Sequence, residues 1–172
     1  MNNTAANMRE EFIQNAIYRL EESTRMIKLS FAKISDEDIW KYPNSKSNSI
    51  GNLILHLCGN ITQYAIASLG ETEDNRDRDK EFDTKEGYTK QELLDLLIGV
   101  LLKAKQVIAT CSEEQLLKKR EVQGFLFSGI GIIMHVVEHY SYHTGQIAFW
   151  IKQLKEEDLG FYKDLDLNLK NK

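Results

Sequence analysis

Three of the four histidines in this sequence lie within one short segment. His135, His139 and His143 recur every four residues in HVVEHYSYHTGQI, and on a helix they would form a column on one face. Neutral imidazole is a ligand for borderline divalent metals such as zinc and nickel. The column and the fourth copy, His56 in NLILHLCGN, therefore point either to a metal site or to a chance clustering of histidine in apolar segments.

Both histidine segments carry a polar stripe along an otherwise apolar helical pattern. In the first segment the stripe consists of Asn52, His56, Asn60 and Gln63. In the second segment it consists of His135, His139, His143 and Gln146. Buried polar groups need partners, so we expect the two stripes to face one another. Two histidines from one helix and a third from the other would supply three ligands and leave a coordination position open for water or substrate.

The spacing of apolar residues predicts four long amphipathic helices that position these stripes. We expect them over residues 8–34, 49–70, 90–111 and 129–155, with polar caps at residues 47–49, at Thr89 and at Ser128. The pattern favours an all-α fold, a four-helix bundle formed by a single domain over residues 1–172.

The segments between and after the helices predict less regular structure. The densely charged residues 71–87 predict an exposed connection after the second helix, long enough for a crossover. Residues 112–129 are expected to form a turn and an extended piece. Residues 156–172 contain Phe161 and Tyr162 among charges, and we expect an ordered tail that packs back onto the bundle.

Composition narrows the functional classes. The formal net charge of -4 provides no basic field to attract nucleic acid or anionic lipid. We expect no secretory leader, because the opening residues MNNTAANMREEF lack a basic start followed by an apolar run. We expect no membrane span, because no apolar run approaches about 18 residues. The two cysteines, Cys58 and Cys111, match no metal-binding spacing, and reduced thiols fit a cytoplasmic protein. We expect a small-molecule substrate, and the apolar faces are compatible with a homodimer.

Together the two histidine segments resemble those of a known family. SIGNLILHLCGN and HVVEHYSYHTGQI are similar to motifs of the DinB-like family, four-helix-bundle proteins that include bacillithiol- and mycothiol-dependent transferases. The resemblance covers nearly the whole chain, and it implies that the metal ligands are His56, His139 and His143. The family's usual pattern has Arg after the last histidine, where this chain has Thr144. This departure weakens the inference that the family's activity applies to this chain more than it weakens the inference that the chain binds a metal.

Two kinds of function are compatible with such a site. An enzyme would be a metal-dependent thiol transferase or hydrolase, in which zinc or nickel acidifies a low-molecular-weight thiol or a water molecule. His135, the extra member of the column, would line the pocket, support a ligand or act as the catalytic acid or base. Asn52, Asn60 and Gln146 would orient ligands or substrate, or simply satisfy polar groups between helices. A non-catalytic, stress-related bundle would instead hold a structural metal, and a fourth protein ligand would mark that case.

Overall fold

The computed structural model describes residues 4–171, with side chains from residue 8 onward. The ends of the predicted domain, residues 1–3 and 172, lie outside the described residues. The helices are α1 (Thr4–Phe31), α2 (Asp36–Ile39), α3 (Ile50–Ile61), the π-helix η1 (Thr62–Leu69), α4 (Arg78–Asp83), α5 (Lys90–Thr110), α6 (Glu113–Leu117) and α7 (Gly129–Lys155). The strands are β1 (Lys119–Val122) and β2 (Phe125–Ser128).

The four long helices form where the sequence predicts them. The side chains of Ser49, Thr89 and Ser128 accept hydrogen bonds from backbone amides in the first turns of α3, α5 and α7. The predicted second helix comprises α3 and η1, because the backbone changes from α-helical to π-helical at Thr62. The chain is mostly helical, which confirms the predicted all-α class.

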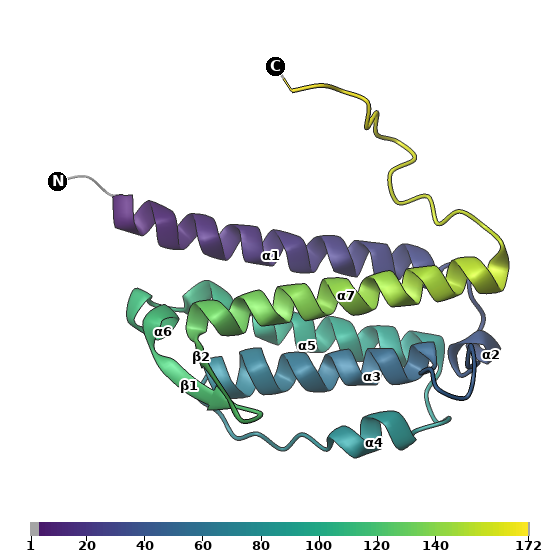
Figure 1. Ribbon diagram of the computed structural model, residues 1–172, viewed down its shortest axis with the longest axis horizontal. Coiled ribbons are helices and arrows are strands. Elements are labelled where there is room, and N and C mark those ends of the chain that lie inside the picture. The colour runs from purple at the N-terminus through teal and green to yellow at the C-terminus, as the bar shows by residue number, and fades with distance from the viewer. Residues whose placement is uncertain (1–3, 172) are drawn as a thin grey trace.

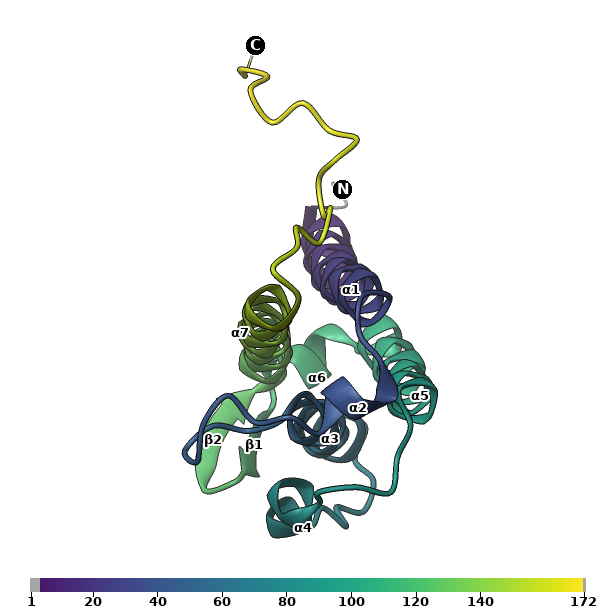
Figure 2. The ribbon, with the colours of Figure 1, turned by 90° about the vertical axis from the view of Figure 1, so that its right-hand side faces the viewer.

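The four long helices pack as a bundle in which consecutive helices are not always neighbours. Seen end-on, α1 and α3 lie at opposite corners, as do α5 and α7 (Figure 2). α1 and α7 run in one direction, and α3 and α5 run in the other (Figure 1). Because α3 and α5 are parallel neighbours, the connection between them runs back along the bundle. This connection, residues 71–87, is called the strap below; it contains α4, which packs on α3.

A short antiparallel hairpin stands where the sequence predicts only a turn and an extended piece. β1 pairs with β2 in a register that places Lys119 opposite Ser128. Between the strands, Gln123 and Gly124 have φ angles of 51° and 78°, the positive values of a two-residue hairpin turn. Gln-Gly replaces the usual Asn-Gly or Asp-Gly signal, and strands this short carry little periodicity, so the sequence does not reveal the hairpin.

Only the first part of the predicted C-terminal tail packs on the bundle. Leu159 is buried, and the Phe161 carbonyl accepts a hydrogen bond of 2.9 Å from the Arg25 guanidinium of α1. The ring of Tyr162 lies beside the same guanidinium, with 5.8 Å between the ring centroid and Cζ. Residues 163–171 are exposed and run away from the bundle (Figure 1). Leucine alternates with polar residues there, and this pattern builds no helical face that could cover the bundle.

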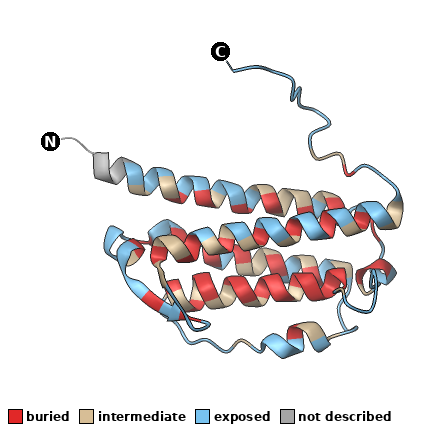
Figure 3. Cartoon of the chain, in the orientation of Figure 1, coloured by how far each residue is buried: buried red, intermediate tan, exposed pale blue. Residues whose placement is uncertain are grey.

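The apolar faces of the helices meet in one hydrophobic core (Figure 3). Its most deeply buried aliphatic side chains include Leu20, Ile27, Ile54, Leu97 and Ile133. Both cysteines are buried as small apolar residues. Among the described helices, none is long and apolar enough to cross a membrane.

Candidate metal centre

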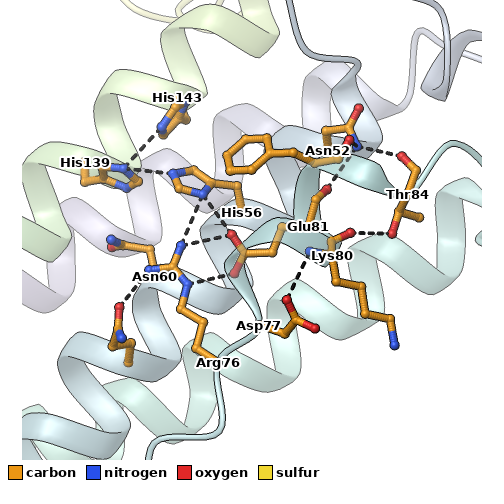
Figure 4. A network of polar contacts seen from close by, with 12 residues as sticks. Asn52, His56, Asn60, Arg76, Asp77, Lys80, Glu81, Thr84, His139 and His143 are labelled. Carbon is orange, nitrogen blue, oxygen red and sulfur yellow. Dashed lines mark hydrogen bonds and ion pairs between the residues drawn. The ribbon is translucent and has the colours of Figure 1, made fainter. Parts of the chain in front are cut away.

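The structure brings together His56, His139 and His143, the histidines that the resemblance implies as ligands. His56 points from α3 toward α7, where His139 and His143 lie one turn apart (Figure 4). The Nε2 atom of His139 is 3.2 Å from the Nε2 of His56 and 3.2 Å from the Nε2 of His143. Ligand atoms of the three rings all lie within 4.8 Å of one another. The two polar stripes therefore face one another, as predicted.

The two separations that involve His139 fit a common metal ion. Two nitrogen ligands about 2.0–2.1 Å from one ion, at angles of about 90–110°, are about 2.8–3.4 Å apart. The 3.2 Å between neighbouring Nε2 atoms falls within this range. Side chains that converge from facing helices are also the usual way in which a helix bundle holds a metal.

A buried carboxylate fixes the orientation of His56. The Oε2 atom of Glu81 lies 2.9 Å from the Nδ1 atom of His56, and each of the two side chains is only 9% exposed. The carboxylate accepts the Nδ1 proton, so the lone pair of His56 is left at Nε2, toward His139. Metal-ligating histidines commonly donate their other ring N–H to such a carboxylate.

Arg76 keeps Glu81 charged in its buried position. Its Nε donates to Oε1 of Glu81 at 2.7 Å, and its Nη2 donates to Oε2 at 2.9 Å (Figure 4). The same Nη2 lies 3.2 Å from Nδ1 of His56, but that nitrogen already donates its proton to Glu81. Burial raises the pKa of Glu81, yet the hydrogen bonds from Arg76 and His56 outweigh it and hold the pKa below its usual value.

His143 is oriented in the same way by a neutral group. The Oε1 atom of Gln146 lies 2.7 Å from Nδ1 of His143, so the amide oxygen accepts the Nδ1 proton and the lone pair is left at Nε2. His139 differs, because its buried Nδ1 atom has no hydrogen-bond partner among the described residues. The protein thus fixes two of the three rings with their lone pairs facing the third.

Burial keeps the imidazoles of His139 and His143 neutral. Desolvation, together with the neighbouring rings of His143 and His56, lowers the pKa of His139 to about 3. Burial also lowers the pKa of His143, although the hydrogen bond to Gln146 acts in the opposite direction. Neutral imidazole is the form that binds a metal, so neither ring has to lose an additional proton at neutral pH.

The strap was predicted to be an exposed connection, and for Arg76 and Glu81 this prediction is wrong. The parallel order of α3 and α5 forces the strap across the outer face of α3, where these two side chains become buried. Asn52 holds the strap there: its Nδ2 donates to the carbonyls of Glu81 at 3.0 Å and of Thr84 at 2.7 Å. Asn52 therefore positions the partner of His56 instead of contacting a ligand itself.

Gly59 allows the strap to approach α3 closely. A Cβ atom at this position would overlap the carboxylate of Glu81 and lie 2.9 Å from Nε of Arg76. Glycine inside a helix is less favourable than alanine by about 0.5–1 kcal/mol, so a glycine here marks a close contact. It is the one sequence signal for the partners of His56, because Glu81 is otherwise one acid among many in a charged segment.

His135 lies beside the three-histidine cluster. Its ring stacks on Tyr64 of η1 with 4.0 Å between centroids, and it is 5.3 Å from the ring of His139. The Nδ2 atom of Asn60 lies 3.2 Å from its Nε2 atom. Burial lowers the pKa of His135 below its usual value. Among the side chains that the structure describes, the group of potential ligands comprises only the other three histidines.

Thr144, which stands where the resemblance leads one to expect Arg, faces the helix packing. Its side chain is 2% exposed, and its hydroxyl donates to the Tyr140 carbonyl at 2.8 Å. Thr144 is therefore part of the packed interior of the bundle.

Comparison with protein families gives one match over most of the chain. A family model described as "Protein of unknown function (DUF1572)" matches residues 7–164. No curated protein matches the chain.

Comparison with solved structures gives the same fold. A DinB-like protein from Bacillus subtilis is 17% identical, with a TM-score of 0.62, over 84% of this chain and 91% of that one. A DinB-like protein from Bacillus cereus ATCC 10987 is 15% identical, with a TM-score of 0.66, over 83% and 90% of the two chains. A conserved protein from Enterococcus faecalis is 17% identical, with a TM-score of 0.64, over 91% and 99%. At such identities the likeness concerns the fold alone.

Proposed function

The chain belongs to the DUF1572 family and has the fold of DinB-like proteins, and on this premise we propose that it is an enzyme that uses a divalent metal ion held by His56, His139 and His143. Zinc and nickel are among the ions that suit three imidazole ligands, and they are our candidates. The reaction we propose is the transfer of a low-molecular-weight thiol to a small-molecule substrate, or the hydrolysis of such a substrate.

The observation that carries this proposal is the convergence of imidazole lone pairs. Glu81 accepts the Nδ1 proton of His56. Gln146 accepts the Nδ1 proton of His143. Both Nε2 atoms therefore present lone pairs to His139, whose own Nε2 can donate a proton to only one of them, although both are 3.2 Å away. A cation at the centre would satisfy all three nitrogens, which favours a metal over a hydrogen-bonded histidine cluster.

The number of protein ligands favours catalysis over a structural metal. Structural zinc sites have four protein ligands, whereas catalytic sites have three and an open position. No fourth ligand joins the three histidines within the part of the chain that the structure describes. Glu81 contacts the far nitrogen of His56, and His135 stacks on Tyr64. The stress-related bundle with a structural metal is therefore the weaker alternative.

The roles we propose for the chain's own residues follow from these contacts. A divalent ion bound at this site would supply a Lewis acid that acidifies a thiol or a water molecule. Glu81 and Gln146 would hold the ligand rings in place. His135 is our candidate for the group that accepts and returns a proton, because it lies one turn from His139 on α7. Asn60 donates to its Nε2 atom, so this contact has to open before the Nε2 lone pair of His135 can accept a proton.

Elemental analysis of the purified protein tests the metal. We expect about one equivalent of zinc or nickel per chain in the wild type, and loss of the metal in His56→Ala and His139→Ala. His135→Gln is the matched control, because it removes a histidine from the same column without removing a proposed ligand, and we expect it to retain the metal. Unchanged metal content in both alanine variants, or equal loss in the control, would end the proposal.

Turnover of model substrates tests the enzyme. Conjugation of chlorodinitrobenzene to added cysteine reports thiol transfer, and release of nitrophenol from nitrophenyl acetate reports hydrolysis, each with and without a chelator. We expect one of the two rates to require the metal and to fall about 10²–10⁴-fold in His135→Gln. Metal-loaded protein that accelerates neither reaction above the buffer rate would instead support the non-catalytic bundle.

A further inference from the structure

A cleft of about 530 Å³ lies beside the metal centre, between residues 43–48 and the C-terminal half of α7. Its walls include Lys46, Asn48, Leu53, Gln146, Phe149 and Trp150. Small-molecule sites have volumes of about 300–1,000 Å³, so the cleft has a suitable size. Gln146 belongs both to this wall and to the metal centre, where it accepts the Nδ1 proton of His143 at 2.7 Å.

The loop that forms one wall of the cleft is held by its own hydrogen bonds. The Oδ1 atom of Asn44 accepts from the backbone amide of Lys46 at 2.9 Å and from the hydroxyl of Ser47 at 3.1 Å. Such a turn fixes the local backbone. Directly before the loop, the hydroxyl of Tyr42 donates to Oδ1 of Asn52 at 3.0 Å, which ties the loop to the start of α3. The backbone at Lys46 is thus positioned without a ligand.

The lining side chains define a class of ligand. Lys46 is exposed and is the only charged residue of the lining, so the cleft favours an anionic group. Phe149 is 66% exposed and, with Trp150, offers aromatic surface to an apolar group. Because Oε1 of Gln146 is engaged by His143, the amide hydrogens on Nε2 of Gln146 are left as donors.

We propose that this cleft binds a small carboxylate with a flat apolar body. The carboxylate pairs with Lys46 and accepts from Nε2 of Gln146, and the body packs on Phe149 and Trp150. This inference rests on the proposed function, because it makes the cleft the binding place of the substrate next to the metal. Gln146 then contacts the ligand through one end of its amide and His143 through the other.

NMR of the tryptophan indole N–H groups tests the cleft. The chain has two tryptophans, so a Trp40→Phe variant assigns the Trp150 signal. The full-length protein is titrated with naphthaleneacetate and with naphthaleneacetamide, an uncharged probe of the same shape. We expect both probes to shift the Trp150 signal saturably, and the acetate to bind at least about threefold more tightly, the size of an exposed charge pair. An unmoved Trp150 signal, or equal dissociation constants for the two probes, would overturn the proposal.

Variants distinguish the proposed charge pair with Lys46 from the proposed packing on Phe149. We expect Lys46→Gln to remove the preference for the acetate and to leave the binding of the acetamide unchanged. Phe149→Ala should weaken both probes by a similar factor. Lys103→Gln is the matched control, because it removes an exposed lysine of α5 outside the cleft, and it should keep the preference. Loss of the preference in this control as well would assign it to the overall charge and refute the cleft.

The same samples distinguish failure of this inference from failure of the proposed function. The titrations are repeated after chelator treatment, and metal content is measured in parallel. As-purified protein that contains no metal, takes up none when zinc or nickel is added and still shows the Trp150 shift contradicts the proposed function and supports the cleft. Protein with bound metal and an unmoved Trp150 signal contradicts the cleft and leaves the proposed function in place.

Discussion

Replacement of Glu81 tests whether a carboxylate outside the histidine cluster controls metal binding. In Glu81→Gln the amide oxygen still accepts the Nδ1 proton of His56, but the negative charge is lost; in Glu81→Ala both are lost. Partners of metal-ligating histidines typically contribute about 10–100-fold to metal affinity. We therefore expect the Kd for zinc to rise about tenfold in Glu81→Gln and about a hundredfold in Glu81→Ala.

The same substitution also affects the stability of the fold, through Arg76. The side chains of Arg76 and Glu81 are 3% and 9% exposed, so Glu81→Ala leaves a buried guanidinium without its carboxylate. Removal of one partner of a buried pair destabilises a protein by about 3–5 kcal/mol. The double variant Arg76→Ala, Glu81→Ala contains no uncompensated charge, and we expect it to regain stability while its zinc affinity stays low.

Both quantities can be measured on the same samples. Competition with a chromogenic chelator at neutral pH gives the zinc affinity, and urea titration gives the free energy of unfolding. Asp83→Asn is the matched control, since it removes an exposed acid from the same helix, α4, and should change neither quantity. If Glu81→Ala binds zinc within about twofold of the wild type, Glu81 does not act on the metal centre and the reasoning from its contact with His56 is wrong.

Three further predictions concern buried positions. Gly59→Ala places a methyl group in the space of the Glu81 carboxylate, so the zinc affinity should fall in the same competition assay, and wild-type affinity would contradict the close approach. Burial raises the pKa of Asp38, but hydrogen bonds from Lys155, Lys41 and Ser35 outweigh it and hold the pKa well below its usual value of 3.8. The stability that this carboxylate contributes is therefore present above about pH 4 and is lost as the pH falls below it. Asp38→Asn should lower the free energy of unfolding by about 1.5–3 kcal/mol near neutral pH, with a smaller difference in acid, and a difference independent of pH would refute this. Burial raises the pKa of the Cys58 thiol to about 12, so iodoacetamide should alkylate it far more slowly in native protein than in urea, as followed by mass spectrometry, and equal rates would show that the thiol is accessible.

The ligands could be predicted from the sequence because helical periodicity and the resemblance constrain them together. The column of three histidines does not by itself identify the three ligands. Each step of four residues turns about 40° beyond a full turn and rises about 6 Å, so His135 and His143 lie about 80° and about 12 Å apart along the helix. One ion cannot contact both, and the third ring comes from His56 on α3.

Glu81 could not be predicted, because its contact with His56 spans 25 residues through a segment without periodicity. That contact depends on the direction in which α5 runs relative to α3, a property of the whole bundle that local patterns do not specify. The hairpin turn at Gln123 could not be predicted either, because glutamine is an unusual residue for a positive φ angle. The predicted homodimer, cytoplasmic location and small-molecule substrate stay predictions.

The strap also separates the packing of the bundle from the basicity of His56, two properties that a protein usually has to change together. The four long helices contain the core and the three histidines, whereas the group that sets the basicity of His56 comes from a segment packed on the outer face of α3. Exchange of this segment would therefore alter the basicity of His56 without repacking the four long helices. Carboxylate and amide side chains at position 81, with Arg76 replaced where the charge is lost, would give different basicities of His56 on one scaffold, a route by which either evolution or a protein engineer could retune the site.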